Sequence, residues 1–286
     1  MCVCADPGVR AVVADAVASA GVEVVVCDAV PEAFHDVALV IVDRATRQAI
    51  GDKLRASGAP VVVVGDDLDD DGLVTLMLEA PVSHLVEDPR DRDLGITSEK
   101  LVTGDLFGLE KYVAPGARVG ERAIADDTDK RRAIAEVCAW AESIGARQPV
   151  VHRIANVVDE LLMNALIDAP RESQPALASA GGARLRWACD DRFIAISVGD
   201  EFGALRQRDV IDNVRRARGE HGRPLRGGDG AGLGLYLVLA NVASLVINVE
   251  PGRRTEVVCL FDLAGRDRRA VASGVRSLHV FSSSAA

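Results

Sequence analysis

Two polar side chains in an otherwise apolar segment could bind a metal ion and activate a nucleophile. In "NVVDELLMNALIDAP", Glu160 and Asn164 are four residues apart, so on a helix they project together from one edge. A carboxylate can orient or deprotonate a water or hydroxyl, and an amide oxygen is a hard ligand suited to magnesium. A solvated polar stripe would carry the same residue types, so the pair alone leaves both interpretations open.

A second candidate is a glycine-rich loop that begins at Arg226, "RGGDGAGLGLYLVLANVASL". Glycine occupies every second position from Gly228 to Gly234, and an apolar run follows. The loop lacks the lysine of a P-loop and the spacing of a dinucleotide fingerprint. The unpaired N–H groups of a helix N-terminus bind phosphates, and glycines let a phosphate chain approach them. The loop therefore predicts an anion site, with a structural turn as the alternative.

The third candidate is Asp200, at the end of the predicted strand "FIAISVGD" and three residues before Gly203. A carboxylate at a strand end can accept a hydrogen bond from the exocyclic amine of a base. A turn-capping aspartate would look the same in the sequence.

In this order the three segments resemble the GHKL ATP-binding fold shared by DNA gyrase, histidine kinases and anti-sigma serine kinases. "ELLMNAL" resembles its Asn box, "VGDEFGAL" its first glycine box and "GAGLGL" its second, over about residues 130–264. The resemblance implies an α+β two-layer sandwich, with a layer of helices over a mixed, largely antiparallel sheet. It also implies ATP and Mg²⁺ as the bound cofactors.

The resemblance assigns a role to each candidate residue. Asn164 would hold magnesium, Glu160 would polarise the nucleophile as the catalytic residue, and Asp200 would bond the adenine amine. The remaining nucleotide-binding positions would be Gly203, Gly228, Gly230, Gly232, Leu233, Gly234 and, on the adenine side, Thr255. Two positions depart from the family, which usually has glycine in place of Phe202 and often has a basic residue in place of Ile167.

The elements that must position these residues follow from the hydrophobic pattern. Amphipathic helices are expected around 129–145 and from Pro149 onward. Two hairpins are expected in "GARLRWACDDRFIAISVGD" and "SLVINVEPGRRTEVVCLFDL". The chain is expected to divide into a pseudo-receiver domain (1–96), a packed connector (97–128), a GHKL ATP-binding domain (129–264) and a C-terminal tail (265–286).

The first domain is predicted to be a small doubly wound α/β domain. Its apolar runs "VCAD", "VEVVVCD", "VALVIVD", "APVVVVGD" and "SHLVED" have the composition of buried parallel strands. More weakly, it resembles a response-regulator receiver in which Asp43 takes the place of the phosphoacceptor. Only Asp6 of the usual acidic pair is present, and Asp88 stands before the proline where the lysine is missing. The resemblance therefore implies a docking or dimerising module that is not phosphorylated.

Composition excludes several partners. The formal charge is −10, which disfavours nucleic acid and anionic membranes. Ala231 to Val249 is free of charge but has acidic flanks and internal polar residues, so a buried helix and strand are expected instead of a membrane span. Six cysteines without a CxxC pair and a start unlike a signal peptide favour a cytoplasmic protein.

Three functions compete on these grounds. The first is an ATP-binding signalling protein, similar to an anti-sigma kinase, whose GHKL domain acts as an ATPase or kinase on a protein partner or as part of a homodimer. The second is a nucleotide-gated interaction module with little turnover. A histidine kinase is least favoured, because no histidine lies between His84 and His152 and such an enzyme needs one ahead of its ATP domain.

Overall fold

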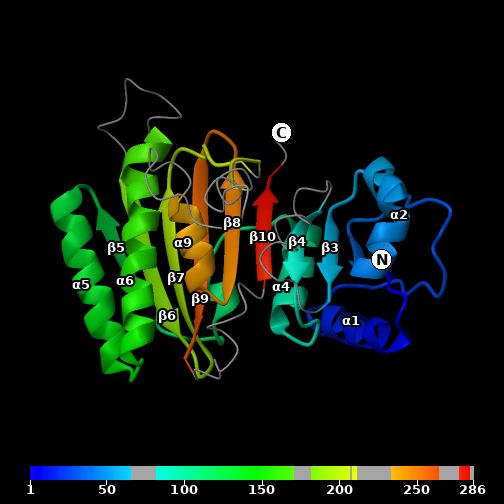
Figure 1. The fold of residues 1–286 in the computed structure, drawn as a ribbon, viewed down its shortest axis with the longest axis horizontal. Helices are drawn as coiled ribbons and strands as arrows, with labels where there is room; N and C mark the ends of the chain where they lie inside the picture. Colours follow the sequence, from blue (N-terminus) through cyan, green and yellow to red (C-terminus); the bar gives the residue numbers. More distant parts are fainter. Residues whose placement is uncertain (66–81, 171–181, 207, 211–232, 264–276, 284–286) are drawn as a thin grey trace. The chain divides into compact units, whose positions relative to one another are not determined.

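The chain divides into two compact units in the computed structural model (Figure 1). The structure describes all residues except 66–81, 171–181, 207, 211–232, 264–276 and 284–286. The first unit comprises Met1–Leu106 with Arg276–His279, and the second comprises Phe107–Val275 with Val280–Ala286. Their boundary falls within the predicted connector, and both units combine helices with strands, so the predicted mixed α/β class is confirmed.

The first unit alternates strands with helices. Its strands are β1 (Cys2–Val3), β2 (Val40–Asp43), β3 (Val61–Val64) and β4 (Val82–Val86). Its helices are α1 (Pro7–Ser19), α2 (Arg44–Ser57) and α4 (Arg92–Thr103). The four strands run parallel in the order β1-β2-β3-β4. Every residue of β3 and the three valine and isoleucine residues of β2 are buried, as expected for parallel strands covered on both faces.

The two edges of this sheet depart from the sequence prediction. The expected strand "VEVVVCD" makes a single parallel bridge, between Val26 and Cys2, because it lies outermost and has only the two-residue β1 as its neighbour. At the opposite edge, the predicted tail contains a strand, β10 (Ser277–Ser282). Its residues Ser277–His279 pair antiparallel with β4.

Buried polar side chains link His279 of β10 to the rest of the first unit. The Nε2 atom of His279 lies 3.1 Å from Asp93 Oδ2, and its Nδ1 atom lies 3.4 Å from Thr97 Oγ1. The rings of His279 and His84 stack with centroids 5.6 Å apart. Both histidines are buried, so the hydrogen bonds compensate for part of the cost of removing polar groups from water.

The second unit is built on an antiparallel sheet in the order β8-β9-β7-β6-β5. Its strands are β5 (Gly120–Ile124), β6 (Ala183–Cys189), β7 (Phe193–Asp200), β8 (Ser244–Glu250) and β9 (Arg254–Asp262). Its helices are the short η1 (Leu109–Tyr112), α5 (Asp127–Ser143), α6 (Gln148–Met163) with its π-helical extension η2 (Asn164–Asp168), and α9 (Leu233–Asn241). Both predicted hairpins and all three expected helices are confirmed.

The helices α5, α6 and α9 lie on one face of this sheet (Figure 1). Helix α6 buries a continuous apolar side, as the sequence pattern predicts: Val150, Val151, Ile154, Val157, Val158, Leu161 and Leu162. Each such side chain contributes about 1.5–3 kcal/mol when it is fully buried. This packing fixes the end of α6, where Glu160 and Asn164 lie.

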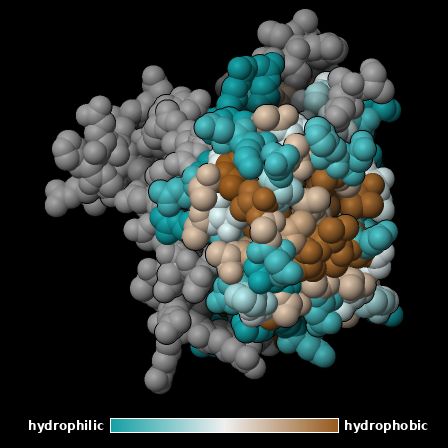
Figure 2. Space-filling view, turned by 90° about the vertical axis from the view of Figure 1, so that its right-hand side faces the viewer, coloured by the Kyte–Doolittle hydropathy of each residue, from teal (hydrophilic) through white to brown (hydrophobic). Residues whose placement is uncertain are grey.

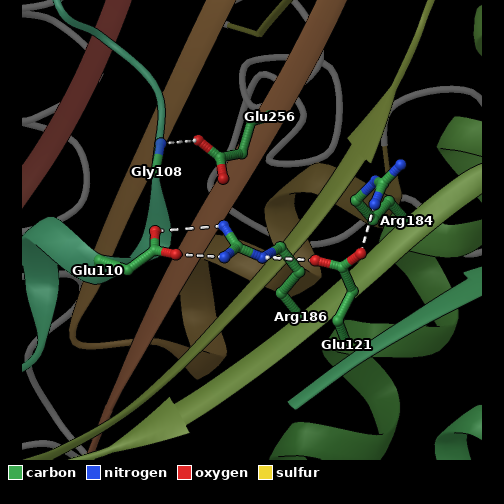
Figure 3. Close-up of polar contacts among 6 residues, drawn as sticks. All are labelled: Gly108, Glu110, Glu121, Arg184, Arg186 and Glu256. Carbon is green, nitrogen blue, oxygen red and sulfur yellow. Dashed lines mark hydrogen bonds and ion pairs between the residues drawn. The ribbon is translucent and has the colours of Figure 1, made fainter. Parts of the chain in front are cut away.

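The opposite face of the sheet holds the segment around η1 through charged side chains (Figure 3). The carboxylate of Glu110 binds the guanidinium of Arg186 with both oxygens, and Glu121 lies 3.2 Å from Arg186 Nε. The buried carboxylate of Glu256 accepts a hydrogen bond of 2.9 Å from the Gly108 amide. The start of the second unit is therefore fixed to its own sheet.

Candidate functional site

The described residues of the three predicted motifs lie on elements that pack together in the second unit. Helix α6 packs against α9 and against β7, and η2 also packs against β7. The Asn-box pair lies at the junction of α6 and η2, the second glycine box leads into α9, and Asp200 ends β7. Elements that are far apart in the sequence thus bring these residues to one region of the fold.

The Asn-box pair has the predicted helical spacing. The amide of Asn164 donates to the carbonyl of Glu160, so the two side chains lie one turn apart and both are half-buried. At Asn164 the α-helix changes to a π-helical turn, in which the Ala169 amide donates to the Asn164 carbonyl. Such turns are rare and frequently occur at functional sites.

Glu160 packs directly on the first turn of α9. A Cβ atom at Gly234 would overlap Oε1 and Cδ of Glu160 and would lie 2.9 Å from its Cγ. Only glycine leaves room for the carboxyl group in this position. Glu160 at the end of α6 and the first turn of α9 are therefore in contact.

The surroundings of Glu160 favour its neutral form. Burial raises its pKa, and the negative charges of Asp159 and Asp168 raise it further, while Lys130 opposes them. Lys130 belongs to α5, is only 7% exposed, and places Nζ 2.9 Å from Asp159 Oδ1. A carboxyl group with a raised pKa is suited to accept a proton from a water or hydroxyl.

Asp200 lies where the sequence places it, at the end of β7 and opposite Thr255 in the ladder with β9. Its Oδ1 accepts hydrogen bonds from the amides of Phe202 at 2.8 Å and Gly203 at 3.3 Å. Burial raises the pKa of Asp200, and the bonds from Phe202, Gly203 and Thr255 offset only part of this effect.

Thr255 adds a buried hydroxyl beside this carboxyl group. The residue is 4% exposed. Its hydroxyl is close enough to favour the charged form of Asp200, yet Oγ1 makes no hydrogen bond of ordinary geometry to any described residue. A buried polar atom without a partner costs free energy. The hydroxyl is therefore available to a ligand that reaches Asp200.

Gly203 has a packing role that does not depend on a ligand. Its φ is +59°, and a Cβ atom there would lie 2.7 Å from the Arg253 amide nitrogen and 2.8 Å from that of Gly252. The amide of Gly252 also donates to the Gly203 carbonyl at 3.2 Å. Gly203 thus joins the loop after β7 to the turn between β8 and β9, and its positive φ and close contacts explain why a glycine stands at this position.

Part of the predicted phosphate-binding loop lies outside the described residues. Gly228, Gly230 and Gly232 fall there, whereas Leu233 and Gly234 form the first turn of α9. Within the described ranges, no group of three or more His, Cys, Asp or Glu side chains could hold a metal ion. Asn164 supplies one oxygen donor, and magnesium in nucleotide sites takes its other ligands from phosphates and water.

The acids of the predicted pseudo-receiver cap helices and tie the strand ends together. Asp43 accepts hydrogen bonds from the amides of Thr46 at 2.7 Å and Ala5 at 2.5 Å, one on each oxygen. Burial would raise its pKa, but the bonds from Thr46 and from the Ala5 and Asp6 amides outweigh burial and lower it. Asp6 caps α1 through the amides of Gly8 and Val9.

Comparisons with known proteins do not assign a family. No family model matches the chain, and none of the curated proteins matches its sequence. Among the helices that the structure describes, none is both long and apolar enough to cross a bilayer.

Proposed function

We propose that the second unit is a GHKL-type ATP-binding domain that takes ATP with Mg²⁺. The observation that carries the proposal is the contact between Glu160 and Gly234, which joins the Asn box to the second glycine box. A chance match of three short motifs would not require their residues to pack on one another. The antiparallel sheet with α5, α6 and α9 on one face agrees with the two-layer sandwich that the resemblance implies.

Each side chain has a distinct task in this site. Asp200, with the Thr255 hydroxyl beside it, would bind the base, because a carboxylate can accept from an adenine edge and a hydroxyl can donate to it. Asn164 would hold the metal ion, which neutralises phosphate charge when it is bound. Glu160 would orient the attacking water or hydroxyl and accept its proton.

The partner of this domain is proposed to be a signalling protein, with the ATP unit acting on it as an ATPase or kinase in the manner of anti-sigma kinases. A second candidate is a module that binds ATP without appreciable turnover. The aliphatic side chain of Ile167, where the family often has a basic residue, favours this second candidate because one charge that could stabilise a transferred phosphoryl group is missing.

Calorimetric titration of the full chain with ATP, with and without Mg²⁺, tests the proposal. Asn164→Ala should abolish the magnesium-dependent part of ATP binding while the circular dichroism spectrum stays unchanged. The matched control is Asn156→Ala, an exposed asparagine two turns earlier on α6, which should bind like the wild type. Phosphate release measured in the same samples separates the two candidates, since binding without release selects the second.

Unchanged ATP affinity in the Asn164 variant would overturn the assignment of the metal ligand. Absence of any ATP binding by the wild-type chain would overturn the proposed function as a whole.

A further inference from the structure

The two edges of the parallel sheet in the first unit differ in how they are paired. At the β4 edge, Ser277–His279 of β10 supplies an antiparallel partner. At the other edge, the segment 22–28 lies beside β1 and pairs with it at Cys2, and no other strand that the structure describes pairs with the segment. Exposed sheet edges invite pairing with another strand, and proteins usually protect them with charge, proline or a covering element.

In the segment 22–28 this protection is limited to the charges of Glu23 and Asp28, and no proline interrupts the segment. Val25 is 55% exposed and Val26 is 43% exposed, and Val30 just beyond the segment is 40% exposed. Figure 2 views the side of the molecule that is drawn in blue at the right of Figure 1, and shows several apolar patches between polar residues. The four valines of the segment 22–28 have high β-propensity, yet the segment makes a single bridge to β1 in the described structure.

Two hydrogen bonds to β1 define which backbone groups of the segment face away from β1. The Val25 carbonyl accepts from the Cys2 amide at 2.8 Å, and the Cys27 amide donates to the Cys2 carbonyl at 2.9 Å. Because successive residues of a strand direct their N–H and C=O groups to opposite sides, Val24 and Val26 present theirs away from β1. These are the groups that a further strand would use.

The segment is also complementary to itself. In an antiparallel pair centred on Val25, Val24 of one chain lies opposite Val26 of the other and exchanges both hydrogen bonds with it. Glu23 then lies opposite Cys27, so like charges are not paired. At the end of the segment, Asp28 Oδ1 lies 3.4 Å from Nη2 of Arg10 in the same chain. A two-fold interface requires this kind of self-complementary patch.

We propose that the segment 22–28 is completed by an antiparallel copy of itself from a second chain, which makes the protein a two-fold dimer through its first unit. Seven paired residues span about 23 Å. The interface falls at or below the lower end of the usual size range, about 1,200 Å². The dimer is therefore expected to be weak, with dissociation in the micromolar range.

Analytical ultracentrifugation of the full chain over a range of concentrations tests the proposal. Val26→Pro removes an amide that points away from β1, a change that an edge strand tolerates, and should weaken the dimer by about tenfold or more. Val26→Thr keeps the β-branched shape and the amide, so it is the matched control and should dimerise like the wild type. Thermal melting checks that both variants fold.

Cross-linking tests the register without relying on proline. The two copies of residue 25 would form a non-hydrogen-bonded pair with Cα atoms about 4.5 Å apart, within reach of a disulfide. In a Cys27→Ser background, Val25→Cys should give a disulfide dimer on mild oxidation. Val30→Cys, at an exposed valine outside the paired residues, should give far less.

A chain that stays monomeric at every concentration, with no Val25→Cys cross-link, overturns the proposal, even if another protein then binds the same edge. A dimer that Val26→Pro does not weaken overturns it as well.

Discussion

Two aspartates end strands in the two units, and their surroundings give them opposite properties. Asp43 ends β2, and each of its oxygens accepts a backbone amide. Asp200 ends β7, and its Oδ1 accepts hydrogen bonds from the amides of Phe202 and Gly203, the second of which is 3.3 Å long. The pKa of Asp43 is lowered despite burial, whereas the pKa of Asp200 is raised by burial.

On this difference we base the proposal that Asp43 is a structural carboxylate and Asp200 a ligand-binding one. The charge of Asp43 is already stabilised by α2 and by the end of β1, so the group gains little from a ligand. The charge of Asp200 is only partly compensated, and the buried hydroxyl of Thr255 lies beside it. Both aspartates end a strand, so the proposal rests on the difference between their hydrogen bonds.

Alanine at position 43 should therefore reduce the stability of the protein, and alanine at position 200 should reduce its affinity for ATP. Asp43→Ala removes the cap of α2 and the bond to Ala5, and should destabilise the protein by about 2–4 kcal/mol with unchanged ATP affinity. Asp200→Ala should weaken ATP by roughly tenfold to a hundredfold at little cost in stability. Urea denaturation and calorimetry measure the two effects. The comparison breaks if both variants lose the same property.

The contact between Glu160 and Gly234 can be measured with a double-mutant cycle. Alanine is a better helix former than glycine, and Gly234 lies in the first turn of α9, but a methyl group at position 234 must displace the Glu160 carboxyl. Gly234→Ala should therefore stabilise the protein in a Glu160→Ala background and should stabilise it less, or destabilise it, with Glu160 present. Additive effects in thermal melts would mean that the two residues do not touch.

A smaller effect is expected from the charge on Glu160. Its folded pKa is raised above the ordinary value of 4.5, so the folded state binds more protons in this range and stability is lost as pH rises through it. Glu160→Gln keeps the shape and removes the charge. It should raise the melting temperature at pH 7.5, and its advantage over the wild type should shrink as the pH approaches 5. An advantage that is constant with pH would show that packing, not charge, is responsible.

The smallest expected effect is no effect at all. Acetyl phosphate with Mg²⁺ should not modify Asp43, because both its oxygens are occupied by backbone amides and the second acid and the lysine of a receiver are absent. Intact-mass spectrometry of the treated protein checks this. Addition of one phosphoryl group per chain, lost in Asp43→Asn, would contradict the assignment of Asp43 as a structural group.

The sequence predicted the elements of the second unit well, because its strands and helices carry strong periodic signals. The apolar side of α6 and the hairpins around Asp190 and Gly252 follow from local pattern alone. The strand expected at 22–28 is incomplete, since a strand needs a partner and propensity does not supply one. Strand β10 was missed because six residues beyond a polar stretch carry too little signal for a strand.

The candidate site was predicted in its residue types but not in its contacts. Helical spacing was enough to pair Glu160 with Asn164. Three contacts depend on tertiary packing. They are the contact of Glu160 with Gly234, the ion pair of Lys130 with Asp159, and the ion pair of Glu110 with Arg186 on the opposite face of the sheet. A lysine on an amphipathic helix has no sequence feature that distinguishes a buried ion pair from a solvated side chain.

The pairing of Ser277–His279 with β4 has a consequence for the order in which the protein is made. Leu106, where the first continuous stretch of the first unit ends, is synthesised about 170 residues before Arg276. At usual rates of translation this interval lasts roughly 10–30 s. During that time the β4 edge and the His84 ring have no β10 against them. The first unit begins to fold early, yet its sheet closes at this edge only after most of the second unit has left the ribosome.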